Sequence, residues 1–138
     1  MNFTDAEKEL SKQLKEAGLE WNPEFGDVVL YHRDFFMVWY SAGKFVVCTP
    51  QEVEVGVDDK KGEYHYQSHY NLMQDNVLWV PCWHQCREEL LKRGWFINNH
   101  FDHNKKVILQ ISNGIYGFYN AEGNTDLEAM YRVLLKVI

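Results

Sequence analysis

Apolar residues recur at the spacing of an α-helix near both ends of the chain. Residues 4–18 begin with a capping-box pattern at Thr4 and end at Gly18, which predicts an amphipathic helix with a narrow apolar stripe. Residues 125–138 begin with a second capping-box pattern at Thr125 and carry a broader apolar stripe. We therefore expect a helix at each end of the sequence.

A third helix is predicted in the middle of the chain, between two strands. Residues 77–80 form a short apolar run typical of a buried strand, and Pro81 ends it because proline has no N–H for a ladder. Pro81 also suits the start of a helix, and Gly94 supplies a left-handed end after residue 93. The positions expected to pack on a sheet are Trp83, Cys86, Leu90 and Leu91.

Short apolar runs separated by polar turns predict two groups of strands. The runs are 28–31, 35–40 and 44–48 before the central helix, and 95–98, 106–111 and 115–119 after it. Asn113-Gly114 lies between the last two runs and is a strong hairpin signal, because both residues tolerate positive φ. The polar stretches 99–104 and 120–124 are predicted to be loops. Such short connections indicate antiparallel pairing.

The order of elements is therefore helix, three strands, an extended insert, helix, three strands, helix. This order predicts an α+β protein with a mainly antiparallel sheet and three helices packed on it. No low-complexity linker divides the chain, and its 138 residues suffice for a sizeable core. We expect a single domain over residues 1–138.

The insert between Pro50 and Asn76 contains the candidate binding surface. In residues 52–57, three valines alternate with two glutamates and a glycine, as in an edge strand, and residues 64–70 contain rings but no aliphatic residue. Rings supply contact area at low entropic cost. The candidate binding residues are Tyr64, His65, Tyr66, His69 and Tyr70. Two alternatives stay open: the rings cover the sheet, or Glu52 and Glu54 prevent pairing with another chain.

Charge argues against two classes of partner. The net charge is −6, from 14 basic and 20 acidic residues, and no basic run is present. Nucleic-acid binding depends largely on phosphate neutralisation, and binding to anionic membranes depends on basic faces, so we expect neither partner. No apolar run reaches transmembrane length, and the first residues lack the order of a signal peptide. An odd number of cysteines, three, favours reduced thiols in a cytoplasm.

Cysteines and histidines are the candidate residues for chemistry. The triplet Cys82-x-His84-x-Cys86 suggests zinc, but on a helix His84 points about 200° away from Cys82, and the C-x-x-C spacing of structural sites is absent. We therefore expect no metal and no cofactor, with both cysteines buried and His84 in solvent. The pairs His65/His69 and His100/His103 are interpreted as ordinary surface histidines, the second pair in a polar loop.

A resemblance supports the fold class. Trp79-Val80-Pro81, followed by Gln85 at the next helical turn and a hydrophobic position at Cys86, resembles a helix start found in small uncharacterised bacterial and phage-borne proteins. The phage-type α/β/α sandwich domain is the family that this half of the chain is most similar to. The resemblance implies a bacterial or prophage setting. It implies no established activity.

These observations predict a non-enzymatic module that binds a protein or associates with itself. The alternative is a small enzyme with a Cys/His-based site, in which Cys82 at the start of a helix would be the nucleophile. No G-x-S-x-G motif or phosphate-binding glycine loop is present. An exposed aromatic patch on the insert would favour the binding module. A His/Cys cluster in a pocket would favour the enzyme.

Overall fold

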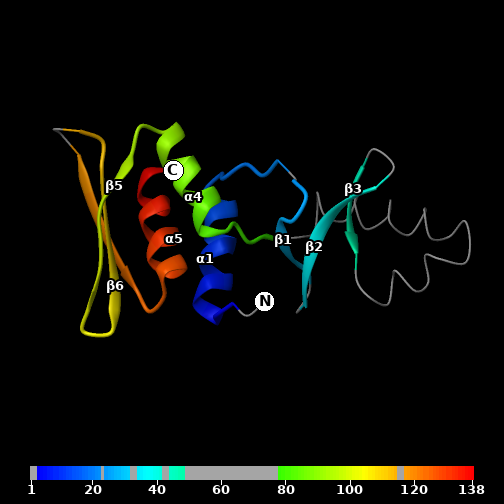
Figure 1. Ribbon diagram of the computed structural model, residues 1–138, viewed down its shortest axis with the longest axis horizontal. Coiled ribbons are helices and arrows are strands. Elements are labelled where there is room, and N and C mark those ends of the chain that lie inside the picture. The colour runs from blue at the N-terminus through cyan, green and yellow to red at the C-terminus, as the bar shows by residue number, and fades with distance from the viewer. Residues whose placement is uncertain (1–2, 23, 32–33, 42–43, 49–77, 115–116) are drawn as a thin grey trace, which may run out of the picture. The chain divides into compact units, whose positions relative to one another are not determined.

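The computed structural model describes residues 3–22, 24–31, 34–41, 44–48, 78–114 and 117–138 (Figure 1). These residues form two compact units, each with its own antiparallel sheet. The first unit comprises the described residues from 21 to 80, and the second comprises those from 3 to 20 and from 81 to 138. The predicted α+β class and the order of helices and strands are confirmed. The expectation of one domain over the whole chain stays a prediction.

Over its described residues, the first unit contains a four-stranded sheet with the order β3-β2-β1-β4. Its strands are β1 (Val28–Tyr31), β2 (Asp34–Ser41), β3 (Lys44–Cys48) and β4 (Leu78–Trp79). All pairs are antiparallel, so the predicted hairpins are confirmed, and the short run before Pro81 pairs with β1 as the fourth strand. The side chains of Val29 and Val38 are fully buried in this unit.

A buried carboxylate organises the loop that precedes β1. The Oδ2 atom of Asp27 accepts hydrogen bonds from the indole Nε1 of Trp21 at 2.8 Å and from the backbone N–H of Glu24 at 2.9 Å. The ring of Trp21 stacks on Trp79, with centroids 6.2 Å apart. Trp21 thus packs on the unit, whereas Phe25 in the same loop is 62% exposed.

Residues 49–77 lie outside the described residues. They include the candidate binding residues Tyr64, His65, Tyr66, His69 and Tyr70, together with the alternating stretch 52–57. A contact surface on the insert therefore stays a prediction.

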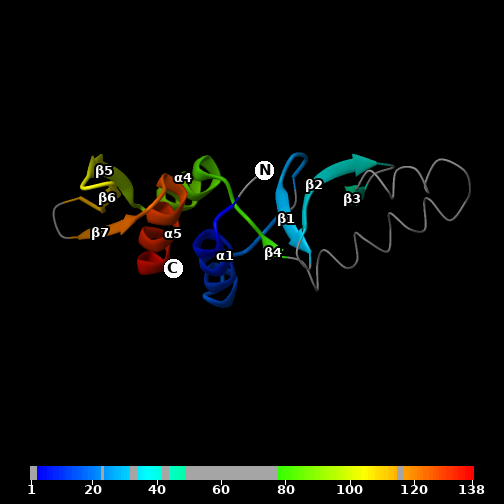
Figure 2. The ribbon, with the colours of Figure 1, turned by 90° about the horizontal axis from the view of Figure 1, so that it is seen from below.

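The second unit contains three helices and a three-stranded sheet with the order β5-β6-β7, counted over its described residues. The helices are α1 (Asp5–Glu16), α4 (Trp83–Lys92) and α5 (Asp126–Val137). The strands are β5 (Phe96–His103), β6 (Lys106–Ser112) and β7 (Phe118–Gly123). Helix α5 packs along one face of the sheet, and α1 and α4 pack against α5 (Figures 1 and 2).

Two predicted loops are wrong, because residues 99–103 and 120–123 belong to strands β5 and β7. The side chains on this part of β5 are polar or exposed, so the apolar alternation that marks a strand is weak there. The turn between β5 and β6 instead lies at Asn104 and Lys105, which have φ of 50° and 62°. His100 and His103 are consequently strand residues.

The turn at Asn113-Gly114 also differs from the prediction. Gly114 has the expected positive φ of +114°. However, Ser112 pairs with Phe118, and strand β7 begins at Phe118, whereas the sequence predicts its start at residue 115. Residues 115 and 116, where the sequence predicts the start of this strand, lie outside the described residues.

Capping residues fix the ends of α1 and α5 and join the two helices. The predicted capping box of α1 is confirmed: the N–H of Glu7 donates to Thr4 Oγ1, and the N–H of Thr4 donates to the Glu7 carboxylate. At α5, Thr125 Oγ1 accepts from the N–H of Glu128, and its hydroxyl donates to the other Glu7 oxygen at 3.0 Å. The Glu128 carboxylate accepts from the N–H of Asn124, so this half of the second capping box differs from prediction.

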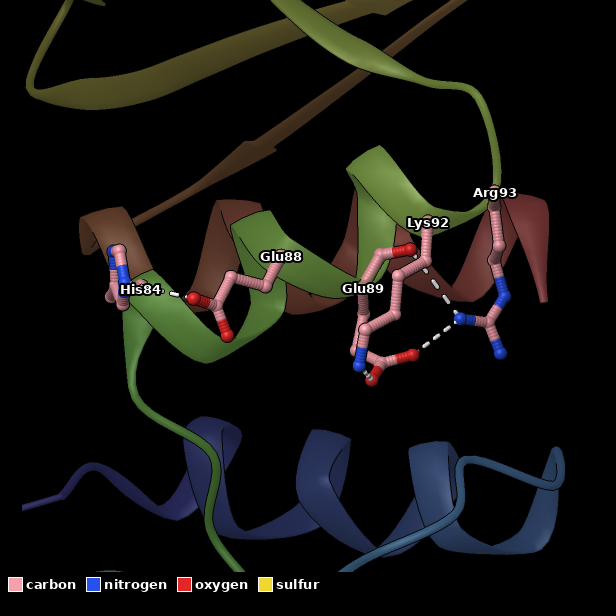
Figure 3. A network of polar contacts seen from close by, with 5 residues as sticks. All are labelled: His84, Glu88, Glu89, Lys92 and Arg93. Atoms are coloured by element: carbon pink, nitrogen blue, oxygen red, sulfur yellow. Dashed lines mark hydrogen bonds and ion pairs between the residues drawn. The ribbon is translucent and has the colours of Figure 1, made fainter.

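Charged side chains line the exposed surface of α4 (Figure 3). Glu89 accepts from Arg93 at 2.5 Å and lies 3.3 Å from the Lys92 amine. His84 pairs with Glu88 at 3.1 Å, and both side chains are largely exposed. Because His84 points into solvent as predicted, it takes no part in the site described below.

Candidate functional site

All three helices of the second unit begin at one open cavity of about 430 Å³. The lining residues come from the start of each helix and from β5: Phe3, Cys82, Trp83, His100, Asp126 and Leu127. Residues far apart in the sequence therefore meet at one end of the helical layer.

Two contacts hold the helix starts around this cavity. The Thr125–Glu7 hydrogen bond joins the first turns of α5 and α1. The buried hydroxyl of Tyr131 donates to the backbone carbonyl of Pro81, which joins α5 to the segment entering α4. Burial in the core raises the pKa of Tyr131, so the phenol stays protonated and keeps this hydrogen bond.

An aromatic stack and a hydrogen-bonded His–Asp pair form one wall of the cavity. The indole of Trp83 stacks on the imidazole of His100, with centroids 5.9 Å apart and planes 24° apart. The Oδ1 atom of Asp126 accepts a hydrogen bond of 2.8 Å from Nε2 of His100. This pair connects β5 to the first residue of α5. The ring of His100 is thus oriented by stacking and by a carboxylate.

The remaining lining is mainly apolar, and the helix ends differ in charge. Phe3, Trp83 and Leu127 contribute apolar side chains to the lining. Acidic residues occupy the first turns of α1 and α5, which suits the positive end of a helix dipole. The first turn of α4 contains no acidic residue. The backbone N–H of its N-cap residue, Cys82, donates to Gln85 Oε1.

The two cysteines of α4 occupy different environments, which corrects half of the prediction. Cys86 is fully buried, as expected, and burial raises the pKa of its thiol. Cys82 was also expected to be buried, but it is exposed. The reason is its position: Cys82 is the N-cap residue of α4, with extended backbone, so it lies outside the buried helix face.

Sequence reasoning missed His100 and Asp126 as site residues. The sequence pattern predicts a loop at His100, and it marks the helix start at Thr125 without singling out Asp126. Their contact joins residues 26 positions apart, and no local pattern encodes it. The one available signal was the predicted helix start at Thr125, which places an acidic residue at a helix end.

Chemically, the cavity combines an apolar hollow with one His–Asp pair and one thiol. Cys82 and His100 line the same cavity, which is the cluster that the enzyme alternative required. Among the described residues, however, no hydrogen bond joins Cys82 to His100, and Nε2 of His100 is engaged by Asp126. No group of three metal-ligating side chains occurs in the part of the chain that the structure covers.

No family model, curated protein or solved structure matches the chain. The resemblance to phage-type α/β/α sandwich domains therefore stays an expectation. Within the described ranges, no helix has the length and apolar character needed to cross a membrane.

Proposed function

We propose that the protein is a non-enzymatic binding module whose cavity takes an apolar side chain of a protein partner. The observation that carries this proposal is the open cavity at the helix starts, lined mainly by Phe3, Trp83 and Leu127. Its volume of about 430 Å³ falls within the range of about 300–1,000 Å³ that is usual for ligand pockets.

The lining favours an aromatic or branched aliphatic group. Such a group gains free energy from leaving water, about 1.5–3 kcal/mol for a fully buried Phe or Leu side chain. The lining residues Trp83 and Phe3 offer aromatic contacts to such a group. The second carboxylate oxygen of Asp126, at the rim, can accept an N–H from the partner's backbone, because Asp126 is largely exposed.

The proposed setting is the reducing cytoplasm of a bacterium, with a prophage origin as the resemblance implies. In support, Cys82 and Cys86 are both free thiols. The acidic balance of the chain supports a protein partner over a nucleic acid.

The alternative function is a Cys/His-based enzyme, and one observation favours it. Cys82 is exposed in the cavity that His100 also lines. An enzyme of this type needs a thiol of high reactivity, whereas a binding module needs only the apolar hollow. The reactivity of Cys82 therefore separates the two functions.

The test compares two thiol reagents, benzyl methanethiosulfonate and methyl methanethiosulfonate, on a Cys48→Ser variant. With each reagent the Cys82 thiolate attacks the sulfur, a disulfide forms, and methanesulfinate leaves. The rate constant for the benzyl reagent is divided by that for the methyl reagent. In this ratio the ionisation of the thiol cancels, so the ratio measures the affinity for the benzyl group. We expect this ratio to be about tenfold higher in the folded protein than in the chain unfolded in urea.

Matched leucine variants serve as controls. Leu127→Gln should return the ratio to that of the unfolded chain, whereas Leu91→Gln, at a position 50% exposed on α4, should leave it unchanged. Equal ratios in the folded and unfolded states would contradict the proposal. The enzyme would be supported instead if Cys82 reacted with both reagents much faster than free cysteine does, and if the His100→Ala substitution lowered both rates.

A further inference from the structure

One carboxylate oxygen at the candidate cavity is available to a ligand. The Oδ1 atom of Asp126 lies 2.8 Å from Nε2 of His100, and among the described residues no hydrogen bond or ion pair is made to its other oxygen, Oδ2. The Asp126 side chain is 62% exposed, so Oδ2 is open to solvent at the rim. Because Asp126 lines the cavity, a ligand that fills the hollow also covers part of this carboxylate.

The other acidic residues in the first turns of α1 and α5 have different surroundings. Glu7 and Glu128 are buried, and each uses both carboxylate oxygens in contacts within the second unit. Asp5 lies outside the described lining of the cavity. Asp126 therefore differs from these residues, because it combines a position beside the hollow with an oxygen that can accept a hydrogen bond from a ligand.

The charge of the lining favours a cationic group next to the apolar one. The described lining contains no Lys or Arg, and its basic side chain, His100, is engaged at Oδ1 of Asp126. Covering a carboxylate oxygen without a partner costs free energy, and a cation offsets this cost better than a neutral N–H does. The net charge of −6 also raises the local concentration of cations around the protein.

We propose, on the basis of the function proposed above, that the cavity takes the N-terminal residue of a polypeptide. Its side chain occupies the hollow, and its α-ammonium group donates a hydrogen bond to Oδ2 of Asp126. The α-ammonium group and the side chain are bonded to the same carbon atom, which matches a carboxylate beside an apolar hollow. A Lys or Arg elsewhere in the partner would carry its charge on a flexible stem, and fixing that stem costs entropy.

The same lining disfavours a free amino acid. The carboxylate of a free amino acid is bonded to the carbon atom that carries the ammonium group, so it would lie near Asp126, where like charges repel. No Lys or Arg of the described lining can pair with it. In a polypeptide a neutral amide stands in place of this carboxylate. Small amines without a carboxylate share the recognised chemistry, and the peptide ligands below separate them from a polypeptide.

NMR titration of the full chain with two matched ligands tests the role of the ammonium group. Phenylalanine amide carries this group, and N-acetyl-phenylalanine amide has the same ring without the charge. We expect the first to bind about tenfold more tightly, because it adds a charge-assisted hydrogen bond. Asp126→Asn should reduce this ratio of affinities to about one, whereas Asp102→Asn, at an exposed position on β5, should preserve it.

The two ligands also separate this inference from the proposed function. Equal affinities of the wild-type protein for both ligands would overturn the recognition of an N-terminus and leave the apolar binding site in place. Binding of neither ligand would overturn both proposals. A ratio that Asp126→Asn leaves unchanged would show that the ammonium group is bound elsewhere, which also overturns the inference.

Peptide ligands test whether the amine belongs to a polypeptide. The amide of Phe-Ala-Ala should bind at least as tightly as phenylalanine amide, since the cavity is open and the chain can continue into solvent. The amide of Ala-Phe-Ala, in which the ring is one residue away from the ammonium group, should bind about tenfold more weakly. Equal binding of the two peptides would overturn the inference. Binding of phenethylamine with rejection of both peptides would assign the cavity to a small amine and would overturn it as well.

Discussion

The helical layer of the second unit is filled along its middle and hollow at one end, although the same three helices form both regions. In the middle, Leu90, Met130, Tyr131 and Leu134 are fully buried. At the helix starts, Trp83 and Leu127 are only half-buried around the cavity. Cys86 and Cys82 show the same contrast one helical turn apart, since the first is fully buried and the second is exposed.

Specific contacts hold the hollow end open. The hydrogen bonds of Thr125 and Tyr131 fix where the helices begin, and the pair of His100 with Asp126 fixes the adjacent strand. Apolar residues are available at the cavity, yet they line it and do not fill it. A fixed, open, apolar hollow is what a binding site requires and what a core avoids.

The largest expected effect compares two leucines of α5. Leu134→Ala should lower the free energy of unfolding by about 2–5 kcal/mol, because it leaves a cavity in the filled region. Leu127→Ala should cost less than about 1 kcal/mol, since its side chain already borders the hollow. Urea unfolding of the two variants measures both values. Equal losses would mean that the cavity end is as tightly packed as the middle.

A second comparison concerns the close approach of strand β7 to helix α5 at Gly123. A Cβ added at Gly123 would lie 2.6 Å from the backbone nitrogen of Ala129, so β7 or α5 would have to shift. We expect Gly123→Ala to destabilise by about 1–3 kcal/mol. Glu122→Ala, at the neighbouring exposed position, should stay within about 0.5 kcal/mol of the wild type. A tolerated Gly123→Ala would show that the start of α5 is not fixed against the sheet.

The hydrogen bonds of Thr125 provide the next test. Thr125→Ala should cost about 0.5–2 kcal/mol, since it removes the helix cap and the donor to the buried carboxylate of Glu7. Thr125→Ser keeps the hydroxyl and should recover most of the loss. Thermal unfolding of both variants gives the comparison, and a serine variant as unstable as the alanine variant would assign the loss to the methyl group.

The smallest effect is a dependence of stability on pH in the filled region. The pKa of Cys86 is raised in the folded state, so the unfolded chain loses this proton first as the pH rises. The contribution of the neutral thiol is present below about pH 8.5 and is lost as the pH rises above it. Cys86→Ala should reduce the alkaline loss of stability, while Leu90→Ala, also buried, should retain it. Identical pH profiles for the two variants would contradict this assignment.

Local patterns predicted most of the fold but little of the site. Pro81, Gly94 and the capping residue Thr4 placed the helices, since caps and breakers act over a few residues. The polar part of β5 was missed, because a strand at the sheet edge needs no apolar alternation when its backbone pairs with β6. Propensity alone therefore undercounts exposed strands.

The cavity could not be predicted, because it depends on contacts between distant segments. His100 and Asp126 meet only after β5 and α5 have packed, and Glu7 meets Thr125 from the other end of the chain. The expected burial of Cys82 was wrong for a related reason: a helix start was treated as part of the helix face. Apolar periodicity predicts which face of a helix is buried, but it does not predict the residue at which the burial ends.

The most direct measurement is an NMR titration of the isotope-labelled protein with N-acetyl-phenylalanine amide, which presents the proposed side chain without a reactive group. We expect chemical-shift changes that saturate and that are confined to residues around the cavity: Phe3, Trp83, His100 and Leu127. The Leu127→Gln variant should lose these changes. Chemical-shift changes that are absent, or that occur only at the exposed strand residues Phe101 and Phe118, would contradict the binding site at the helix starts.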